Sequence, residues 1–196
     1  MRLLLATHNE HKRREFERLL EGCELELLPD SVALPPEDGD TFAANAQGKA
    51  QAAAAATGRV TIADDSGIAA AALGGRPGVR SARYAGERAT DEENLAKLIE
   101  EAPAGSALEY VCVIAYVEPE SGRERLFEGR CSGRLEPATR GARGFGYDPA
   151  FLPDDGPPGL TMAELSDAQK DAISHRGRAA RALLSWLARE PTEDGA

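Results

Sequence analysis

The chain has 196 residues, 42% of them hydrophobic and 29% charged, which is typical of one globular domain with a substantial core. Its formal net charge of −10 argues against a nucleic-acid-binding surface, because such a surface needs a basic patch. The first apolar run is too short for a signal peptide or membrane span, and three distant cysteines lack metal or redox spacing, so we expect a cytoplasmic protein without membrane contact.

The first predicted unit is a strand, a turn and a helix. Residues 3–6 are an apolar run typical of a buried strand, residues 7–9 form the turn, and a helix is predicted over residues 10–20 with Asn9 as its N-cap. The free N–H groups and positive dipole end of such a helix suit a phosphate group. Lys12 would add a positive charge there, although a solvated surface lysine is an equally good interpretation.

The next segments lead to a pair of adjacent carboxylates. A strand is predicted over residues 25–28, followed by a loop rich in Pro, Asp and Gly and by an alanine-rich helix over residues 41–56. A third strand, residues 60–63, ends directly in residues 64–67, Asp-Asp-Ser-Gly, which we predict to form a turn. Carboxylates at this end of a strand lie where open α/β sheets bind ligands. The competing interpretation is an ordinary polar turn.

The middle of the chain predicts a mixed sheet. Thr90 and Glu93 form a capping box that begins a helix through Glu101. Residues 108–117 and 124–131 predict the two strands of a β-hairpin. Antiparallel strands beside the initial strand–helix unit indicate an α/β fold with a mixed sheet.

A glycine-flanked aromatic segment follows at residues 144–149, Gly-Phe-Gly-Tyr-Asp-Pro. Its glycines would let Phe145 approach a flat ligand closely, and a base stacked on an aromatic ring gains ~1–3 kcal/mol. The alternative interpretation is a buried aromatic corner that only packs the core.

The last segments are predicted to be helical. A short polar helix over residues 163–173 contains Lys170, and His175 and Arg176 precede a final amphipathic helix that ends at Leu187. This His-Arg pair suits recognition of a base, but a helix cap and a surface charge explain it equally well. We expect one domain over residues 1–190, with a frayed tail over residues 191–196.

Together, the candidate side chains favour phosphate chemistry with a hard metal ion. Carboxylates beside lysines suggest Mg²⁺ and phosphate, because Mg²⁺ is held by one or two carboxylates and by substrate oxygens. The sequence has no Cys/His cluster for a softer metal. We predict that Asp65 binds the metal and orients or deprotonates the attacking water, with Asp64 behind it.

Four motifs resemble one known family. Residues 64–86, DDSGIAAAALGGRPGVRSARYAG, are similar to the signature of the inosine/xanthosine triphosphate pyrophosphatases, the ITPase family. Residues 7–12 (THNEHK), residues 144–149 (GFGYDP), and the stretch from Ala163 through Lys170 to Arg176 resemble the same family in the same order. The resemblance covers the chain from Leu3 to about Leu187.

The resemblance implies a fold, a reaction and an assembly. The expected fold is a two-lobed α/β fold around a long mixed sheet, with helices on both sides and a central cleft. The expected reaction is Mg²⁺-dependent hydrolysis of ITP, dITP and XTP between the α- and β-phosphates, which gives the monophosphate and pyrophosphate. Members of the family are cytoplasmic and usually homodimeric.

The resemblance also implies roles for individual residues. Glu37 matches a metal-binding carboxylate of the family, and Lys49 matches a lysine near the phosphates. The turn that cradles the triphosphate is matched by Thr7, Asn9 and Lys12, whereas His8 and His11 stand at variable positions of that turn. The full set of residues expected to contact substrate is Thr7, His8, Asn9, Glu10, His11, Lys12, Lys49, Ser66, Phe145, Gly146, Tyr147, Asp148, Lys170, His175 and Arg176.

The chemistry of the base supports this assignment, and two alternatives remain. A 6-keto purine presents an acceptor where adenine presents an amino donor, so donors from His175 or Arg176 would favour hypoxanthine and xanthine. The alternatives are a related pyrophosphatase for modified pyrimidine nucleotides and a catalytically silent nucleotide-binding protein. Release of pyrophosphate from dITP, with and without Mg²⁺, separates both alternatives from this assignment.

Overall fold

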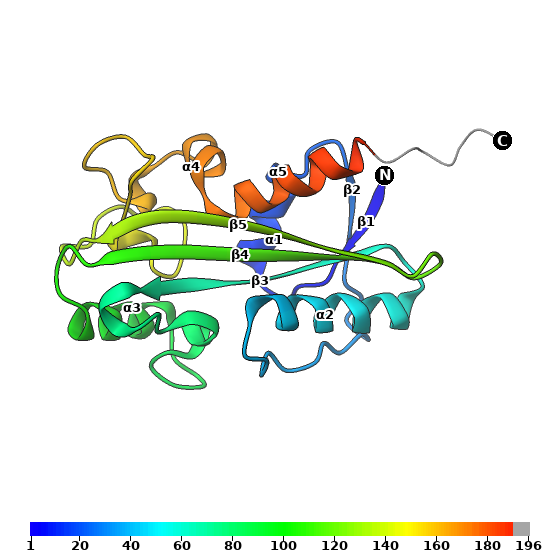
Figure 1. The fold of residues 1–196 in the computed structure, drawn as a ribbon, viewed down its shortest axis with the longest axis horizontal. Coiled ribbons are helices and arrows are strands. Elements are labelled where there is room, and N and C mark those ends of the chain that lie inside the picture. Colours follow the sequence, from blue (N-terminus) through cyan, green and yellow to red (C-terminus); the bar gives the residue numbers. More distant parts are fainter. Residues whose placement is uncertain (190–196) are drawn as a thin grey trace.

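One six-stranded sheet with helices on both faces forms the centre of the fold (Figure 1). The computed structural model describes residues 1–189, so the predicted frayed tail lies outside the described residues. The sheet order is β2-β1-β3-β4-β5-β6. The strands are β1 (Arg2–Leu5), β2 (Glu24–Leu27), β3 (Thr61–Ala70), β4 (Ala107–Glu118), β5 (Arg123–Leu135) and β6 (Phe151–Pro153).

The sheet is mixed, as predicted. Strand β1 pairs in parallel with β2 and β3, whereas β3, β4, β5 and β6 pair in antiparallel fashion. The β4–β5 pair is the predicted hairpin, and β6 was missed because a three-residue strand has no detectable periodicity.

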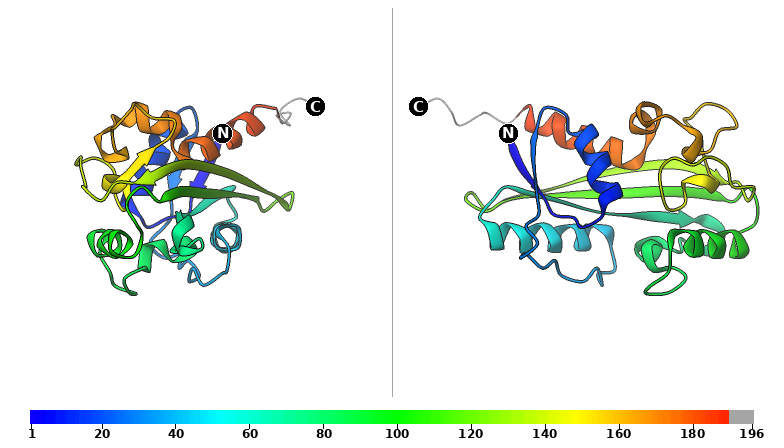
Figure 2. Two further views of the ribbon diagram at one scale, coloured as in Figure 1. Left: turned by 60° about the vertical axis from the view of Figure 1, so that its left-hand side comes forward. Right: turned by 180° about the vertical axis from the view of Figure 1, so that it is seen from behind.

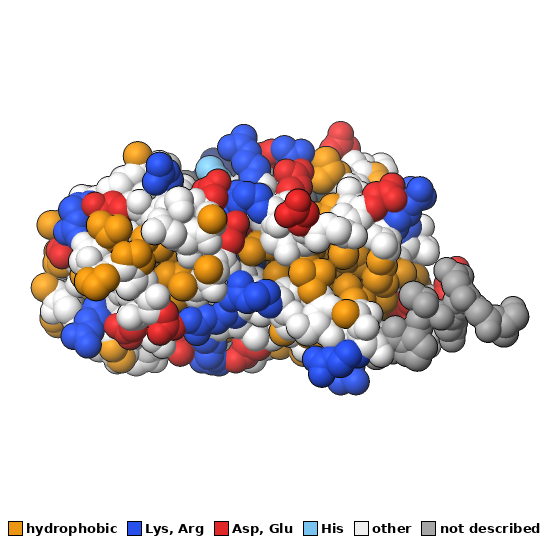
Figure 3. All heavy atoms as spheres, turned by 90° about the horizontal axis from the view of Figure 1, so that it is seen from above, with side chains coloured by type: hydrophobic (Ala, Val, Ile, Leu, Met, Phe, Trp, Pro, Cys, Tyr) orange, Lys and Arg blue, Asp and Glu red, His pale blue; other side chains and the backbone are white. Residues whose placement is uncertain are grey.

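Within residues 1–189, five α-helices cover the two faces (Figures 1 and 2). Helices α2 and α3 lie on one face, and α1, α4 and α5 lie on the other. On the face that carries α4 and α5, basic and acidic side chains are interspersed (Figure 3). The bounds are α1 (Glu10–Leu19), α2 (Phe42–Thr57), α3 (Asp91–Glu101), α4 (Asp167–Ile173) and α5 (His175–Leu187).

Side-chain caps explain where three of these helices begin, and those at Asn9 and Thr90 were predicted. The Asn9 carboxamide accepts hydrogen bonds from the backbone N–H groups of His11 and Lys12, at 2.9 and 3.1 Å. Thr41 caps α2 through the N–H of Ala44. Thr90 and Glu93 form the complete capping box that begins α3.

The predicted turn over residues 64–67 is wrong, because strand β3 continues through it to Ala70. Each residue from Thr61 to Ala70 has a register partner on β4, so the ladder satisfies the backbone groups that a turn would have released. Asp64 and Asp65 therefore point to opposite faces of a continuous strand.

The prediction of one short helix over residues 163–173 is also partly wrong. A 3₁₀ turn covers Met162–Glu164, and α4 begins only at Asp167, after a capping box formed by Ser166 and Gln169. Lys170 does lie in this helix, as expected. The final helix begins at His175, so the His-Arg pair forms its first turn instead of preceding it.

Three clusters of buried apolar side chains hold the layers together. One packs β1 and β3 against α1 and α5, a second packs the opposite face against α2, and a third surrounds Ile68, Leu98 and Phe151 at the far end of the sheet. We propose that the chain is a single domain with two lobes, as predicted. The separation of the far-end cluster from the other two supports this proposal. Within residues 1–189, no helix combines the length and apolar character that a membrane crossing requires.

Candidate active site

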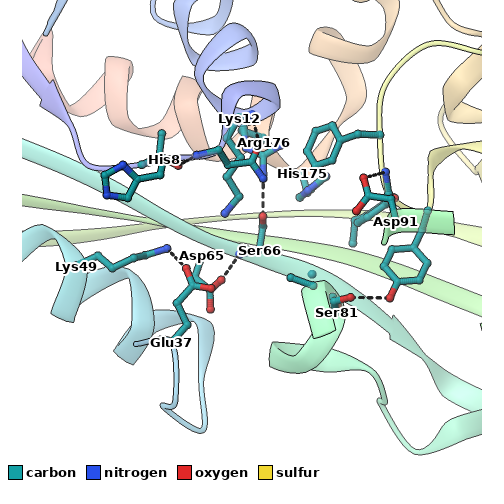
Figure 4. Close-up of a pocket in the computed structure, with 18 of the residues that line it drawn as sticks. His8, Lys12, Glu37, Lys49, Asp65, Ser66, Ser81, Asp91, His175 and Arg176 are labelled. Carbon is teal, nitrogen blue, oxygen red and sulfur yellow. Dashed lines mark hydrogen bonds and ion pairs between the residues drawn. The ribbon is translucent and has the colours of Figure 1, made fainter. Parts of the chain in front are cut away.

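A cavity of about 350 Å³ opens where β1 ends, α1 begins and β3 passes across the sheet (Figure 4). Two of the predicted site residues, Glu10 and His11, are not in its wall: Glu10 pairs with Arg13 at 2.6 Å, and the His11 ring stacks on Phe145 with centroids 5.1 Å apart. The predicted residues that line the cavity are Thr7, His8, Asn9, Lys12, Glu37, Lys49, Asp65, Ser66, Phe145, Gly146, Tyr147, Asp148, Lys170, His175 and Arg176.

Asp64 anchors two cations from beneath the cavity. Its carboxylate is fully buried, and its Oδ2 atom lies 3.1 Å from Lys12 Nζ and 3.1 Å from an Arg176 nitrogen. Burial alone would raise the pKa of Asp64, but the charges of Lys12 and Arg176 outweigh burial and hold this pKa below its ordinary value. Asp64 is therefore a permanent anion at neutral pH.

Glu15 continues this network on the same face of the sheet. It accepts hydrogen bonds from Arg176 and, at 2.7 Å, from Lys170 Nζ, which also lies 2.6 Å from Asp148 Oδ2. Burial would raise the pKa of Glu15, but Arg176 and Lys170 lower it to about 2. Asp148, Lys170, Glu15, Arg176, Asp64 and Lys12 thus form a chain of alternating charges along the cavity.

Asp65 lies on the opposite side of β3 in a different environment. Its Oδ2 atom accepts a 2.8 Å hydrogen bond from Asn45 of α2, and its Oδ1 atom accepts one from the N–H of Ser66 at 2.9 Å. Burial, and then the nearby charge of Glu37, raise the pKa of Asp65. Asp65 is therefore a stronger base than an ordinary aspartate.

Glu37 and Lys49 complete this second cluster (Figure 4). The Lys49 ammonium forms an ion pair with Glu37 and donates a 2.5 Å hydrogen bond to the backbone carbonyl of Asp64. Arg83 donates to the Glu37 carbonyl at 2.5 Å, which holds the loop that carries Glu37 against the site.

The donor set of this cluster fits a magnesium ion. Among residues 1–189 there is no group of three or more His, Cys, Asp or Glu side chains arranged to hold a metal ion. Mg²⁺ nevertheless needs only one or two protein carboxylates when substrate phosphates and water supply its other oxygens. Glu37 and Asp65 lie close enough for the charge of one to raise the pKa of the other, and a divalent cation between them would relieve that repulsion.

Aromatic rings and a neutral histidine form the other end of the cavity. The cations of Lys170 and Arg176 lie 5.2 and 5.8 Å from the centre of the Phe145 ring. His175 stacks on Tyr110 with centroids 4.5 Å apart. Burial, and then the charge of Arg176, keep the pKa of His175 well below its ordinary value, so the ring is neutral. Its Nδ1 atom is buried and has no hydrogen-bond partner within the described chain.

Sequence reasoning missed Glu15, Asn45 and Tyr110. Glu15 lies among charged residues of an amphipathic helix and resembles its exposed neighbours, although its position directly before the buried Phe16 was a usable signal. Asn45 lies four residues before Lys49, and this helical spacing places both side chains on one face of α2. Tyr110 lies in a continuous run of buried residues of β4 and carried no separate signal.

Comparison with known proteins identifies relatives over nearly the whole chain. The model of the Ham1 family matches residues 3–186. A dITP/XTP pyrophosphatase of Symbiobacterium thermophilum is 48% identical over 193 residues, covering 95% of this chain and 94% of the relative. The dITP/XTP pyrophosphatase of Geobacter sulfurreducens is 44% identical, and the match covers 95% of this chain and 96% of the relative.

Solved structures agree with these sequence matches. A HAM1 protein from Coxiella burnetii superposes with a TM-score of 0.84 at 38% identity, covering 97% of this chain and all of the other. A nucleoside-triphosphatase, dITP/XTP pyrophosphatase, from Mycobacterium abscessus gives a TM-score of 0.72 at 42% identity. This match covers 94% of this chain and 99% of the other.

Proposed function

The chain belongs to the Ham1 family, and from this premise we propose that it hydrolyses the triphosphates of deaminated purines, ITP, dITP and XTP, to the monophosphate and pyrophosphate. The observation that carries the proposal is that one cavity holds a carboxylate–lysine cluster at one end and an aromatic ring beside a neutral histidine and an arginine at the other. The first end suits a triphosphate, and the second suits a flat base with a keto oxygen.

Asp65 is the residue proposed to activate water. A water oxygen attacks the α-phosphorus, its proton passes to the Asp65 carboxylate, and the bond to the β-phosphate breaks, so that pyrophosphate leaves. The raised pKa of Asp65 makes it a better proton acceptor than an ordinary aspartate. Lys12 and Lys49 place positive charge where the leaving group develops negative charge.

We further propose that Glu37 and Asp65 hold Mg²⁺. When bound, the ion would neutralise charge on the phosphates, as magnesium does in other phosphoryl-transfer sites. The support for this proposal is the donor chemistry of two facing carboxylates beside a lysine. Replacing Glu37 with Gln is expected to raise the Mg²⁺ concentration needed for half-maximal activity. Titration of Mg²⁺ with the variant and the parent enzyme measures this shift.

His175 and Arg176 are proposed to select the base. The Arg176 guanidinium carries donors in a fixed fork, and neutral His175 presents one donor and one acceptor. A 6-keto oxygen accepts from these donors, whereas the 6-amino group of adenine would face them donor to donor. Phe145 is proposed to stack on the base.

A homodimer in the cytoplasm is proposed on the resemblance to the family. The free cysteines Cys23, Cys112 and Cys131 are consistent with a reducing compartment. The segments that we propose as its interface are residues 79–84 and the last helix, and both also pack within the chain, since Ser81 and Leu183 are buried. Sedimentation at micromolar concentration tests the dimer, and a monomer would contradict it.

A panel of nucleoside triphosphates tests the proposed function directly. We expect pyrophosphate release from ITP, dITP and XTP in the presence of Mg²⁺, with far slower release from ATP and dGTP. Modified pyrimidine triphosphates belong in the panel, because a preference for them would replace the purine assignment. Absence of pyrophosphate from every nucleotide would leave a binding protein without activity.

A further inference from the structure

Asp64 is shared by the two ends of the cavity. Its Oδ2 atom lies 3.1 Å from Lys12 and 3.1 Å from Arg176, so one oxygen anchors both cations. The carboxylate is 0% exposed, whereas Lys12 and Arg176 line the cavity. Asp64 can therefore act on a ligand through these two side chains.

The two cations serve different parts of the proposed substrate. Lys12 lies in the first turn of α1, at the positive end of the helix dipole, which suits phosphate. Arg176 lies in the first turn of α5, next to His175, with its guanidinium 5.8 Å from the centre of the Phe145 ring. Lys12 thus belongs to the phosphate end and Arg176 to the base end.

Arg176 is held in a fixed orientation with Asp64 as one of its three anchors. Its two terminal nitrogens contact Glu15, Asp64 at 3.1 Å and Ser66 Oγ at 2.7 Å. A buried guanidinium that loses one acceptor must turn or recruit another, because an unpaired buried donor is costly. The position of Arg176 toward a base is therefore sensitive to the charge at Asp64.

We propose that Asp64 is a positioning residue that couples base selection by Arg176 to phosphate binding by Lys12. This inference rests on the proposed function, since it needs a substrate with a base and a triphosphate. Loss of the Asp64 charge removes an anchor from both cations at once. Loss of Lys12 leaves Arg176 as the cation in direct contact with the Asp64 carboxylate, which draws the guanidinium toward β3 and away from the base.

The first test is Asp64→Asn, assayed with ITP and ATP. We expect KM for ITP to rise and the ratio of kcat/KM for ITP over ATP to fall by about tenfold, the size expected for one charged hydrogen bond. Asp171→Asn is the matched control, because Asp171 also accepts from an arginine, Arg18 at 2.9 Å, but lies outside the cavity wall. It should leave both values unchanged.

The second test keeps Asp64 intact, so it remains decisive if Asp64→Asn does not fold. Lys12→Met should lower the ITP/ATP ratio by about fivefold, a size usual for coupling between neighbouring residues, although Lys12 lies at the phosphate end. Lys49→Met should slow both nucleotides equally, because the Lys49 ammonium forms its ion pair with Glu37 and its hydrogen bond with the backbone carbonyl of Asp64, and so does not hold the carboxylate that anchors Arg176. Substitutions at two residues that share a partner have coupled effects on the free energy, whereas the effects of substitutions at independent sites add.

The outcomes separate the inference from the function on which it rests. If the parent enzyme releases no pyrophosphate from ITP, the proposed function fails. If the parent is active but Asp64→Asn and Lys12→Met slow ITP and ATP equally, Asp64 is only structural and the inference is overturned. A fall in the ratio with both variants, and not with Lys49→Met, supports it.

Discussion

Asp64 and Asp65 are consecutive residues of β3, yet their carboxylates lie on opposite sides of the strand in opposite electrostatic environments. Asp64 is fully buried between Lys12 and Arg176, whose charges outweigh burial and lower its pKa. Asp65 accepts from Asn45 and lies near Glu37, and burial with that second carboxylate raises its pKa. Two identical side chains therefore differ in their environments, which suit one to be a fixed anion and the other to be the proposed proton acceptor.

The first prediction is that Asp65→Asn lowers kcat by at least ~100-fold, the lower bound usual for a general base. An amide cannot accept the proton or supply the charge for a metal. The parent kcat should fall as the pH falls through the raised pKa of Asp65. Steady-state kinetics on dITP across pH measure both effects, and near-parent activity of the variant would exclude Asp65 as the base.

The same substitution should leave the fold intact or stabilise it. A carboxylate whose folded pKa lies above its unfolded value is destabilising once ionised, and that cost develops as the pH rises through the unfolded pKa. Asp65→Asn removes this cost at neutral pH. We expect an unchanged or higher Tm in thermal unfolding at pH 7, and a clear decrease would show that Asp65 is held mainly for stability.

The second prediction concerns acid stability and Glu15. Its folded pKa, about 2, lies below the ordinary value of 4.5, so its contribution to stability is complete above about pH 4.5 and lost as the pH falls toward 2. Glu15→Gln leaves Lys170 and Arg176 without a shared counter-charge and should cost ~3–5 kcal/mol at pH 7. Urea unfolding at several pH values measures this cost.

Glu17→Gln is the control for that experiment, because Glu17 is exposed and lies 3.9 Å from Arg13 on the surface of the same helix. It should change the free energy of unfolding by less than ~1 kcal/mol. If Glu15→Gln and Glu17→Gln have the same free energy of unfolding at pH 7, the buried ion pairs of Glu15 contribute no net stability.

Glu15 also shows why part of the site was hidden in the sequence. Its partner Arg176 lies 161 residues further along the chain, and local pattern cannot reveal a pair formed only when α1 and α5 pack on the same face. Residues that lie within a sequence motif, such as Asp65 and Phe145, were predicted as site residues, and both line the cavity. Residues such as Asn45, which act through a side chain brought from another element, were not.

The fold shows the same division between local and distant causes. The caps at Asn9 and Thr90 were predictable, because a cap is decided by residues three positions apart. The continuation of β3 through Asp64 was not, since two aspartates disfavour a strand locally. The ladder to β4 and the cations brought by α1 and α5 outweigh that local preference.

The third prediction separates base choice from chemistry. His175→Phe keeps an aromatic ring against Tyr110 but removes the imidazole nitrogens from the cavity. Leaving a buried 6-keto acceptor unpaired costs ~1–3 kcal/mol, so the preference for ITP over ATP should fall by about one to two orders of magnitude. Values of kcat/KM for ITP and ATP measure this ratio. An equal loss on both nucleotides would mean that His175 does not contact the base.

The fourth prediction uses a glycine that lets α5 approach the sheet. A Cβ atom on Gly129 of β5 would lie 2.1 Å from the His175 carbonyl oxygen and 2.5 Å from the Ala179 nitrogen, both backbone atoms. Gly129→Ala must therefore push the first turn of α5 outward, together with His175 and Arg176. We expect a loss of ~1–3 kcal/mol in the free energy of unfolding, as for other overpacked sites, and a reduced ITP/ATP ratio.

Gly48→Ala is the opposite control for this displacement. A Cβ atom on Gly48, in the middle of α2, would meet nothing within 4 Å, and alanine is favoured over glycine in a helix by ~0.5–1 kcal/mol. Urea unfolding should therefore show a higher free energy of unfolding for Gly48→Ala and a lower one for Gly129→Ala. Only Gly48→Ala should leave the ITP/ATP ratio unchanged. If Gly129→Ala keeps the parent ratio, close packing of α5 on β5 does not position the residues that select the base.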